Sequence, residues 1–291
     1  MKKRIDAFDV INTIILTALM FLCLYPFIYV IFASFSDPWQ LSLHKGLLIR
    51  PLGFTTAGYK AVFTNRSIWT GYGTTLFNLV VGTSINILLT LLAAYGISRD
   101  GLMLKKPLTV MIVVTMFFNS GIIPRFLVVR DLGLYNTRMS MILPTAINVF
   151  NLIIMRTAIE GIPRDLEEAA VIDGANHFTI LFRIFTPLIK STLAVLILYY
   201  GVAHWNQWYQ ALMYIQDRDK YPLQLVLREI LIGNSTESMT AGSVDSLGES
   251  FMLGETIKYS TIIVATVPIL LIYPMLQKHF VKGVMVGAVK G

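Results

Sequence analysis

The chain is poor in charged residues and almost free of cysteine. Only 14% of its 291 residues are Asp, Glu, Lys or Arg, whereas a soluble protein carries about 25%. The single cysteine, Cys23, excludes an intrachain disulfide and a cysteine-based metal site, and the four histidines form no H-x-x-x-H pair. We therefore expect no metal site, and we expect lipid to cover much of the surface.

The short motifs of nucleotide binding and catalysis are also missing. The sequence contains no G-x-x-x-x-G-K-[ST] phosphate-binding loop, no H-E-x-x-H and no G-x-S-x-G. We therefore expect no catalytic residues and no cofactor bound by this chain. The net charge of +7 is spread over short loops, a distribution typical of cations that flank membrane spans rather than of a nucleic-acid-binding surface.

Apolar stretches dominate the sequence, since 55% of the residues are hydrophobic and the mean hydropathy is +0.65. Six stretches without a charged residue approach or exceed the ~20 residues that cross a bilayer as a helix. Helices are required there because lipid offers no partner for backbone N–H and C=O groups. The stretches do not alternate as the strands of a membrane barrel do, so the sequence predicts an all-α transmembrane protein with six helices. The six are residues 10–36, 67–98, 107–124, 139–155, 191–216 and 259–277.

The basic residues favour one orientation in the membrane. The first four residues include two lysines and an arginine, and the apolar run after them exceeds the about 7–15 residues of a signal peptide. We therefore interpret this run as a retained first helix. Positive charge in the N-terminal tail and in the short connection 99–106 places both on the cytoplasmic side. Both termini are then cytoplasmic, and residues 37–66 and 217–257 form outer loops.

The stretch between the fourth and fifth spans, residues 160–187, has a distinct local pattern. Pro163 stands where a first helical position would be, and acidic residues follow it, as at a helix N-terminus. A face of small residues then leads to Gly174, which permits a sharp turn or the close approach of another backbone. A second short helix follows and ends at Pro187. The small-residue face is Leu166, Ala169, Ala170 and Asp173, the exposed side carries Arg164, Glu167 and Glu168, and the second helix has Phe178, Leu181, Phe182 and Phe185 on one face.

Two interpretations of this stretch are open from the residues alone, a surface helix that only joins two spans and an element that docks a partner. Its spacing resembles the EAA loop of ABC importer permeases, which reads E-A-A, three residues, G, nine residues, I, one residue, L-P. The one departure is Thr186, which stands at the leucine position. The matching residues are Glu168, Ala169, Ala170, Gly174, Ile184 and Pro187.

Other segments are similar to the carbohydrate-uptake branch of that family. They are Trp205-Asn206 in the fifth span and the closing segment 283–291. Within this branch the chain resembles the smaller permease subunit of the maltose importer. It is more similar still to permeases for oligosaccharides from complex polysaccharides.

This resemblance implies a six-helix type I ABC importer permease, with residues 1–291 forming a single transmembrane domain in the bacterial cytoplasmic membrane. It also implies partners: a second homologous permease, two ATPase subunits that bind the ATP, and an extracytoplasmic sugar-binding protein, with an oligosaccharide as substrate. The EAA loop would seat in a groove of one ATPase, with Glu168 and Gly174 at the joint. By position, segment 233–248 corresponds to a family loop that reaches into the binding protein, and the tail 287–291 would insert between the ATPases.

Polar side chains inside spans are costly and usually face a cavity or the bundle interior. Sugars offer hydroxyl groups to amides and apolar faces to aromatic rings, so the fifth span is the best candidate for a substrate pathway. The two asparagines of the fourth span share a helix face at i, i+3, and His204 lies one turn before Trp208. Interhelical hydrogen bonding is the alternative role, and it is favoured for Asn78 and Asn86. The candidate pathway residues are Asn119, Asn148, Asn151, His204, Trp205, Asn206, Gln207 and Trp208.

A secondary transporter driven by an ion gradient is the competing hypothesis. Such a protein needs an ionisable residue buried within a span as a relay, and the six uncharged stretches contain no Asp, Glu, Lys or Arg. A membrane-embedded enzyme is disfavoured because no paired carboxylates lie within a span. The sequence therefore predicts a permease subunit that is powered by separate ATPases.

Overall fold

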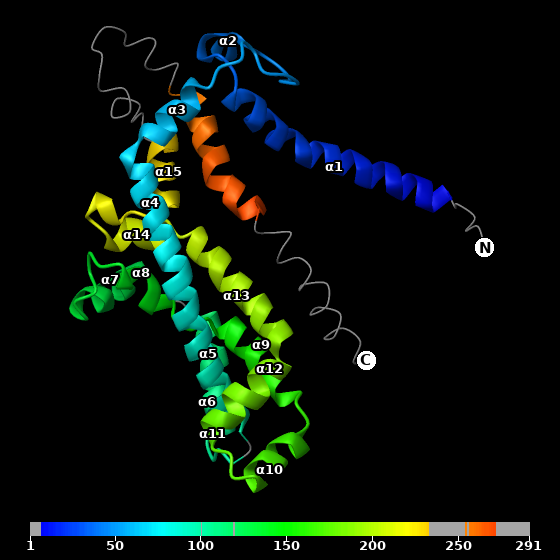
Figure 1. The fold of residues 1–291 in the computed structure, drawn as a ribbon, viewed down its shortest axis with the longest axis vertical. Helices are drawn as coiled ribbons and strands as arrows, with labels where there is room; N and C mark the ends of the chain where they lie inside the picture. The colour runs from blue at the N-terminus through cyan, green and yellow to red at the C-terminus, as the bar shows by residue number, and fades with distance from the viewer. Residues whose placement is uncertain (1–6, 100, 119, 233–253, 255, 272–291) are drawn as a thin grey trace. The chain divides into compact units, whose positions relative to one another are not determined.

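The computed structural model describes residues 7–99, 101–118, 120–232, 254 and 256–271, and Figure 1 shows the course of the chain. These residues are helical apart from turns, connections and one isolated bridge between Ser36 and Phe54. The prediction of an all-α chain is confirmed for this part of the protein. The chain divides into two compact units, residues 1–69 with 227–268 and residues 70–226 with 269–291.

Two helices are by themselves long and apolar enough to cross a membrane, Phe8–Ser34 and Arg66–Ser98. Three further pairs of helices pass the same test only when the two bent members of a pair are counted as one span. With these pairs, the number of possible spans within the described ranges rises to five. A shorter apolar helix, Thr256–Leu271, overlaps the predicted sixth stretch. The bent pairs are Lys105–Phe117 with Ile122–Asp131, Met139–Thr145 with Val149–Glu160, and His177–Leu188 with Lys190–Trp205.

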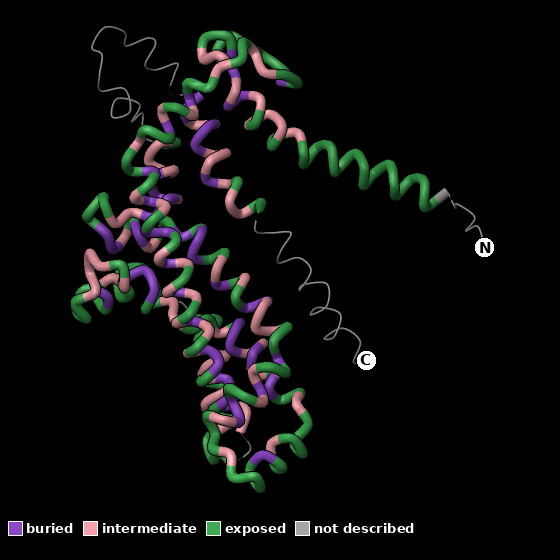
Figure 2. Tube along the Cα trace, viewed as in Figure 1, coloured by how far each residue is buried: buried purple, intermediate pink, exposed green. Residues whose placement is uncertain are grey.

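The first unit begins with a long apolar helix and two short ones. Asp37 caps the start of the second helix, because its carboxylate accepts hydrogen bonds from the backbone N–H groups of Trp39 and Gln40, both at 3.1 Å. The apolar window of the first helix has no buried residue, as Figure 2 shows. Such a surface is typical of a helix covered by lipid or by another chain. The helices are α1 (Ala7–Ser34), α2 (Pro38–Leu43) and α3 (Ala57–Thr64).

The second unit is a helix bundle with a continuous apolar core. Its centre is α5 (Thr83–Ser98), which packs along α9 (Val149–Glu160) and α13 (Lys190–Trp205). The buried core continues into the 160–187 stretch, because Ala170, Ile180, Leu181 and Phe185 belong to the same cluster as the core residues of these three helices. That stretch is therefore packed onto the bundle and is more than a free connection between two spans.

The remaining labelled helices in the described part of the chain are short, and two of them, η1 and η3, are π-helical turns. They are α4 (Arg66–Phe77), η1 (Asn78–Gly82), α6 (Lys105–Phe117), α7 (Ile122–Asp131), α8 (Met139–Ile142), η2 (Leu143–Thr145), α10 (Arg164–Ile172), α11 (His177–Thr179), η3 (Ile180–Phe185), α12 (Thr186–Leu188), α14 (Tyr209–Tyr214), η4 (Arg218–Lys220) and α15 (Leu223–Ile232).

Two predicted spans are broken where the sequence suggested single helices. The third stretch becomes α6 and α7, which are bent by 116°, and Gly121 between them has a φ of +77°, a conformation that favours glycine. The fourth becomes α8 and η2, bent by 53° from α9, with Pro144 inside η2 just before the break. The prediction of uninterrupted helices over 107–124 and 139–155 is therefore wrong, because averaged hydropathy does not register a change of direction.

The predicted fifth span, 191–216, is also broken. The helix α13 ends at Trp205, and α14 begins only at Tyr209. Between them, the buried side chain of Gln207 donates a hydrogen bond to the backbone carbonyl of Met141, which holds the turn against α8 of the fourth span. His204 and Trp208 consequently do not lie one turn apart on one helix, and that expectation is wrong.

Candidate coupling site

The start of α10 follows from proline and acidic residues. The helix begins at Arg164, and Pro163 lies directly before it in an extended conformation with φ −56° and ψ 133°, one position earlier than predicted. Asp165 and Glu167 lie in the first turn. Their negative charge is favourable there because the unpaired N–H groups give a helix N-terminus positive character.

The end of α10 requires glycine. Gly174 has a φ of +80°, its N–H donates to the carbonyl of Val171 at 3.0 Å, and the N–H of Ala175 donates to the carbonyl of Ala170 at 2.9 Å. This pair of bonds is the Schellman arrangement, which ends a helix with one left-handed residue. No atom of the described chain lies within 4 Å of the position that a Cβ on Gly174 would occupy. The turn is therefore sharp, and its outer side is open.

The second helix of the stretch runs through α11, η3 and α12. Asn176 caps it by accepting a hydrogen bond from the N–H of Thr179 at 2.8 Å. Leu181 and Phe185 are buried, but Phe178 and Phe182 are exposed, so the prediction of one face for all four is wrong. The physical reason is the π-helical turn Ile180–Phe185, whose wider spacing places these side chains on different sides.

Thr186, the departure from the EAA pattern, has a local hydrogen bond. Its hydroxyl donates to the carbonyl of Leu181 at 2.7 Å, and the same carbonyl also accepts the backbone N–H of Thr186. Pro187 follows inside α12 rather than ending it, and an 87° bend at Ile189 then leads into α13. Ile184 is half-buried and packs against the apolar core.

The outer side of the stretch carries exposed apolar side chains. Around Gly174 in the sequence, Val171, Ile172 and Phe178 are exposed, Ile172 to 85% and Phe178 to 68%. Glu168 and Ala169 are exposed as well. Exposed apolar side chains grouped beside a charged residue are typical of a surface that another protein covers. We call residues 160–187 the coupling loop from here on.

The inner side of the coupling loop is tied to the end of α5. Glu167 forms an ion pair with Arg99, the residue that follows α5. The Arg99 guanidinium also donates to the hydroxyl of Tyr95 at 3.2 Å and lies over its ring, and that hydroxyl is 3.2 Å from Nδ1 of His177. The prediction that Glu167 lies on the open side is wrong, since its side chain is only 23% exposed.

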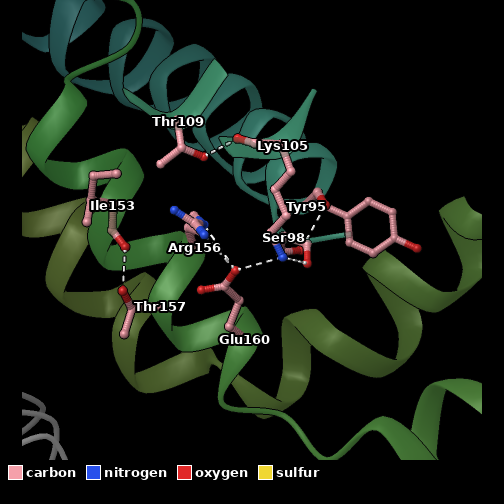
Figure 3. Close-up of polar contacts among 8 residues, drawn as sticks. All are labelled: Tyr95, Ser98, Lys105, Thr109, Ile153, Arg156, Thr157 and Glu160. Atoms are coloured by element: carbon pink, nitrogen blue, oxygen red, sulfur yellow. Dashed lines mark hydrogen bonds and ion pairs between the residues drawn. The ribbon is translucent and has the colours of Figure 1, made fainter. Parts of the chain in front are cut away.

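A second tie lies at the start of the coupling loop, as Figure 3 shows. The carboxylate of Glu160, the last residue of α9, is 3.2 Å from the ammonium group of Lys105 and 2.9 Å from the guanidinium of Arg156. The same Lys105 donates to the carbonyl of Ser98 at 3.0 Å. The ends of α5, α6 and α9 are thus joined by one cluster of charges.

Between the two ties is a cleft of about 700 Å³ with charges of both signs. Glu168 belongs to its lining and is exposed, so it is available at the surface of α10. The charged residues of the lining are Arg99, Lys105, Glu160, Arg164, Glu167 and Glu168.

The polar residues predicted for a substrate pathway divide into two groups. His204 is buried, and its Nε2 lies 2.6 Å from Oδ1 of Asn86. The Asn86 amide donates to the carbonyls of Thr145 and Ala146 at 3.0 and 2.7 Å, so its oxygen must accept and His204 must donate. The imidazole fits because Gly82 has no side chain: a Cβ there would lie 2.5 Å from Nε2.

The two asparagines of the fourth span lie at the break before α9 and at the start of that helix. Asn148 precedes α9 and caps it by accepting the N–H of Asn151 at 3.1 Å, so the two do not share a helix face as predicted. The N–H of Asn148 donates to the hydroxyl of Tyr200 at 3.0 Å, and that hydroxyl is 2.7 Å from the hydroxyl of Thr90. Sequence reasoning missed Thr90 and Tyr200, although a hydroxyl inside an apolar stretch is a signal of such a bond.

The other predicted pathway residues differ in exposure. Trp205 is buried, with its ring edge-on to that of Tyr72 at 6.3 Å between centroids. Asn206 and Trp208 are exposed. Asn119, the outer segment 233–248 and the tail 287–291 lie outside the described residues.

The described residues form an all-helical bundle with bent, apolar helix pairs, an architecture that membrane transport permeases share. The chain belongs to the family of binding-protein-dependent transport system inner membrane components, whose model matches residues 86–286. It is therefore a multi-pass permease subunit of an ABC importer in the inner membrane. It is a transport subunit and not an enzyme, and it works with ATPase and binding-protein partners.

Individual relatives extend over nearly the whole chain. The chain is 41% identical to the polygalacturonan/rhamnogalacturonan transport system permease protein YtcP of Bacillus subtilis (strain 168), covering 100% of both chains. It is 39% identical to protein LplC of the same organism, over 98% of this chain and 95% of that protein. Among solved structures it is similar to a bacterial ABC transporter that imports the acidic polysaccharide alginate, with a TM-score of 0.86, 29% identity, and 96% and 99% of the two chains covered.

Proposed function

We propose that this chain is one six-helix permease half of a sugar importer whose substrate is an oligosaccharide. The support is the 41% identity to a polygalacturonan/rhamnogalacturonan permease over the full length, together with the likeness to an alginate importer. The other parts of the proposed assembly are a second homologous permease, two ATPase subunits that bind the ATP, and an extracytoplasmic binding protein. Both termini of this chain are cytoplasmic in the proposal.

The observation that carries the proposal is the two-sided construction of the coupling loop. Its inner side is fixed to the bundle by the ion pairs of Glu160 and Glu167 and by the buried side chains of η3. Its outer side, around Gly174, is open and partly apolar. A loop built in this way can receive a partner on one side and pass its movement to the spans on the other.

In the proposed mechanism, these connections transmit movement from the coupling loop to the spans. ATP closes the ATPase pair, which displaces the coupling loop seated on it. The displacement reaches α5 through Glu167 and Arg99, and it reaches α13 through η3 and the 87° bend at Ile189. The bundle then changes between inward- and outward-facing states, which requires that ATP bind the two states with different free energies.

The predicted pathway residues receive different roles in this proposal. We assign the exposed Asn206 and Trp208, which lie at the break between α13 and α14, to the sugar pathway. We assign His204, Gln207 and Asn148 to holding the broken spans together, since each bonds a neighbouring element.

Binding-protein-stimulated ATP hydrolysis in nanodiscs tests this function. The chain is purified after mild detergent extraction with the subunits that accompany it, and the binding protein is loaded in turn with different oligosaccharides. We expect a second permease and an ATPase to co-purify, and we expect hydrolysis to rise when a loaded binding protein is added. Sugar uptake by the isolated chain without ATP would contradict the proposal.

A further inference from the structure

Arg125 of α7 lies between two cavities of the second unit. One cavity, of about 220 Å³, is bounded by α7 and α14, and the other, of about 360 Å³, by α7 and η2. Arg125 lines both cavities, and its side chain is exposed. The smaller cavity is lined by Gly121, Ile122, Arg125, Tyr209, Gln210 and Tyr214, among others.

The two cavities occupy the place where three broken spans meet. Ser120 and Gly121 come from the break between α6 and α7, Leu143 and Pro144 come from η2 just before the break in the fourth span, and α14 follows the break after α13. Irregular backbone at membrane depth is tolerated only where it is buried in protein or lines a cavity, and transporters place substrates at such discontinuous helices. The position is therefore suited to contact with a solute.

The side chains around the smaller cavity match an acidic sugar. A guanidinium offers a planar set of donors that pairs with a carboxylate through two hydrogen bonds. Tyr209, which is 39% exposed, supplies a ring face and a hydroxyl, and Gln210 supplies an amide. A volume of about 220 Å³ is below the ~300–1,000 Å³ of pockets that enclose a drug-sized ligand, so it suits a single sugar unit of a longer chain.

A second arginine on the same helix provides the contrast. Arg130 is also exposed, and it is absent from the lining of both cavities. A cation that only flanks a membrane span is expected to resemble Arg130. Arg125 differs because it lines both cavities, and the smaller of the two also has aromatic and amide side chains in its lining.

We infer that Arg125 binds the carboxylate of a uronic acid unit during translocation, and that the substrate is therefore an acidic oligosaccharide. This inference rests on the proposed function, because it assumes that the chain carries sugar. It adds the charge class of the substrate and names the residue that selects it. Tyr209 and Gln210 then contact the ring of the same unit.

Transport in proteoliposomes that contain the complete importer tests the inference. The probes are an oligogalacturonate with free carboxylates and its methyl ester, each delivered by the same saturating binding protein. For each substrate, the rates of the permease variants are compared with one another. Because all variants receive that substrate from the same binding protein, the preference of the binding protein for one substrate does not affect the comparison. In Arg125→Gln we expect transport of the free acid to fall about tenfold or more, since a charged hydrogen bond is lost, while transport of the methyl ester changes less than about twofold. Arg125→Lys retains the charge and should recover part of the transport rate of the free acid. Arg130→Gln should change the transport rate of neither substrate.

Three results would overturn the inference. Arg125→Gln could carry the free acid as fast as the unaltered importer, or it could lose both substrates equally, as an arginine that anchors α7 at the membrane surface would. The unaltered importer could also carry only neutral oligosaccharides, which would leave the proposed function standing. If the unaltered importer carries no oligosaccharide of either kind, the proposed function itself fails.

Discussion

Arg99, directly after α5, forms an ion pair with Glu167 of α10, and so joins the end of a long membrane helix to the first turn of the coupling loop. The same guanidinium bonds the hydroxyl of Tyr95 within α5. Since both partners are partly exposed, at 29% and 23%, the pair contributes no more than about 1 kcal/mol to stability. Its importance in this account is mechanical, because it is a direct connection from the loop to a span.

The first prediction concerns this ion pair. Glu167→Arg should reduce ATP-driven transport several-fold, because it places two cations at the tie between α10 and α5, and the added exchange Arg99→Glu should restore much of the loss. Transport per ATP hydrolysed in proteoliposomes is the measurement. Asp165→Asn is the control, since Asp165 is in the same first turn but outside the pair. If Glu167→Gln and Asp165→Asn reduced transport per ATP equally, the negative charge at the N-terminus of α10 would explain the loss, and the ion pair with Arg99 would not.

The second prediction concerns the contact between Gly82 and His204. Gly82→Ala should destabilise the protein by about 1–3 kcal/mol, because the new Cβ would lie 2.5 Å from the imidazole. His204→Ala should also destabilise it, since it leaves a space and removes the donor to Asn86. The double variant should lose less than the sum of the two, because the clash is gone. Thermal unfolding in detergent measures all three, and strict additivity would contradict the contact.

A third prediction separates structure from transport at the fourth span. Asn148→Ala should lower stability by about 0.5–2 kcal/mol through loss of the cap on α9, whereas Asn148→Asp should retain the cap. Neither change should alter the KM for sugar transport by more than about twofold, while Trp208→Ala should raise it. A large change of KM in a stable Asn148 variant would place that residue in the sugar pathway instead.

The sequence predicts the apolar stretches and the loop between the fourth and fifth spans well, because length, hydropathy and the glycine spacing are local properties. Gly174 ends α10 in a left-handed turn, as its position before a second helix suggests. The breaks are not predicted by hydropathy, since apolar residues continue through them. The turn at Gln207 depends on the carbonyl of Met141, which is 66 residues earlier in the chain.

The roles of the polar residues could be narrowed but not assigned from the sequence. From the sequence, Asn148 is expected on the face of a continuous helix. In the structure α9 begins at Val149, so Asn148 is the N-cap of that helix. Arg125 closely follows an uncharged stretch and looks like an ordinary flanking cation. Only the 116° bend between α6 and α7 brings it beside residues of α14.

One pair of variants tests most directly whether the ATPase docks on the outer side of the coupling loop. Gly174 and Gly133 are both left-handed, at φ +80° and +70°, both end a helix with the same two hydrogen bonds, and both have open space where a Cβ would be. Gly174→Trp and Gly133→Trp therefore carry a similar backbone strain, but only the first blocks the proposed ATPase seat.

Transport per ATP hydrolysed is measured for the two variants in proteoliposomes, together with co-purification of the ATPase. We expect that the ATPase no longer co-purifies with Gly174→Trp, or that transport per ATP hydrolysed falls at least about tenfold in this variant. Gly133→Trp should retain both the ATPase and the transport. Full assembly and coupled transport in Gly174→Trp, or equal loss in both variants, would contradict this docking.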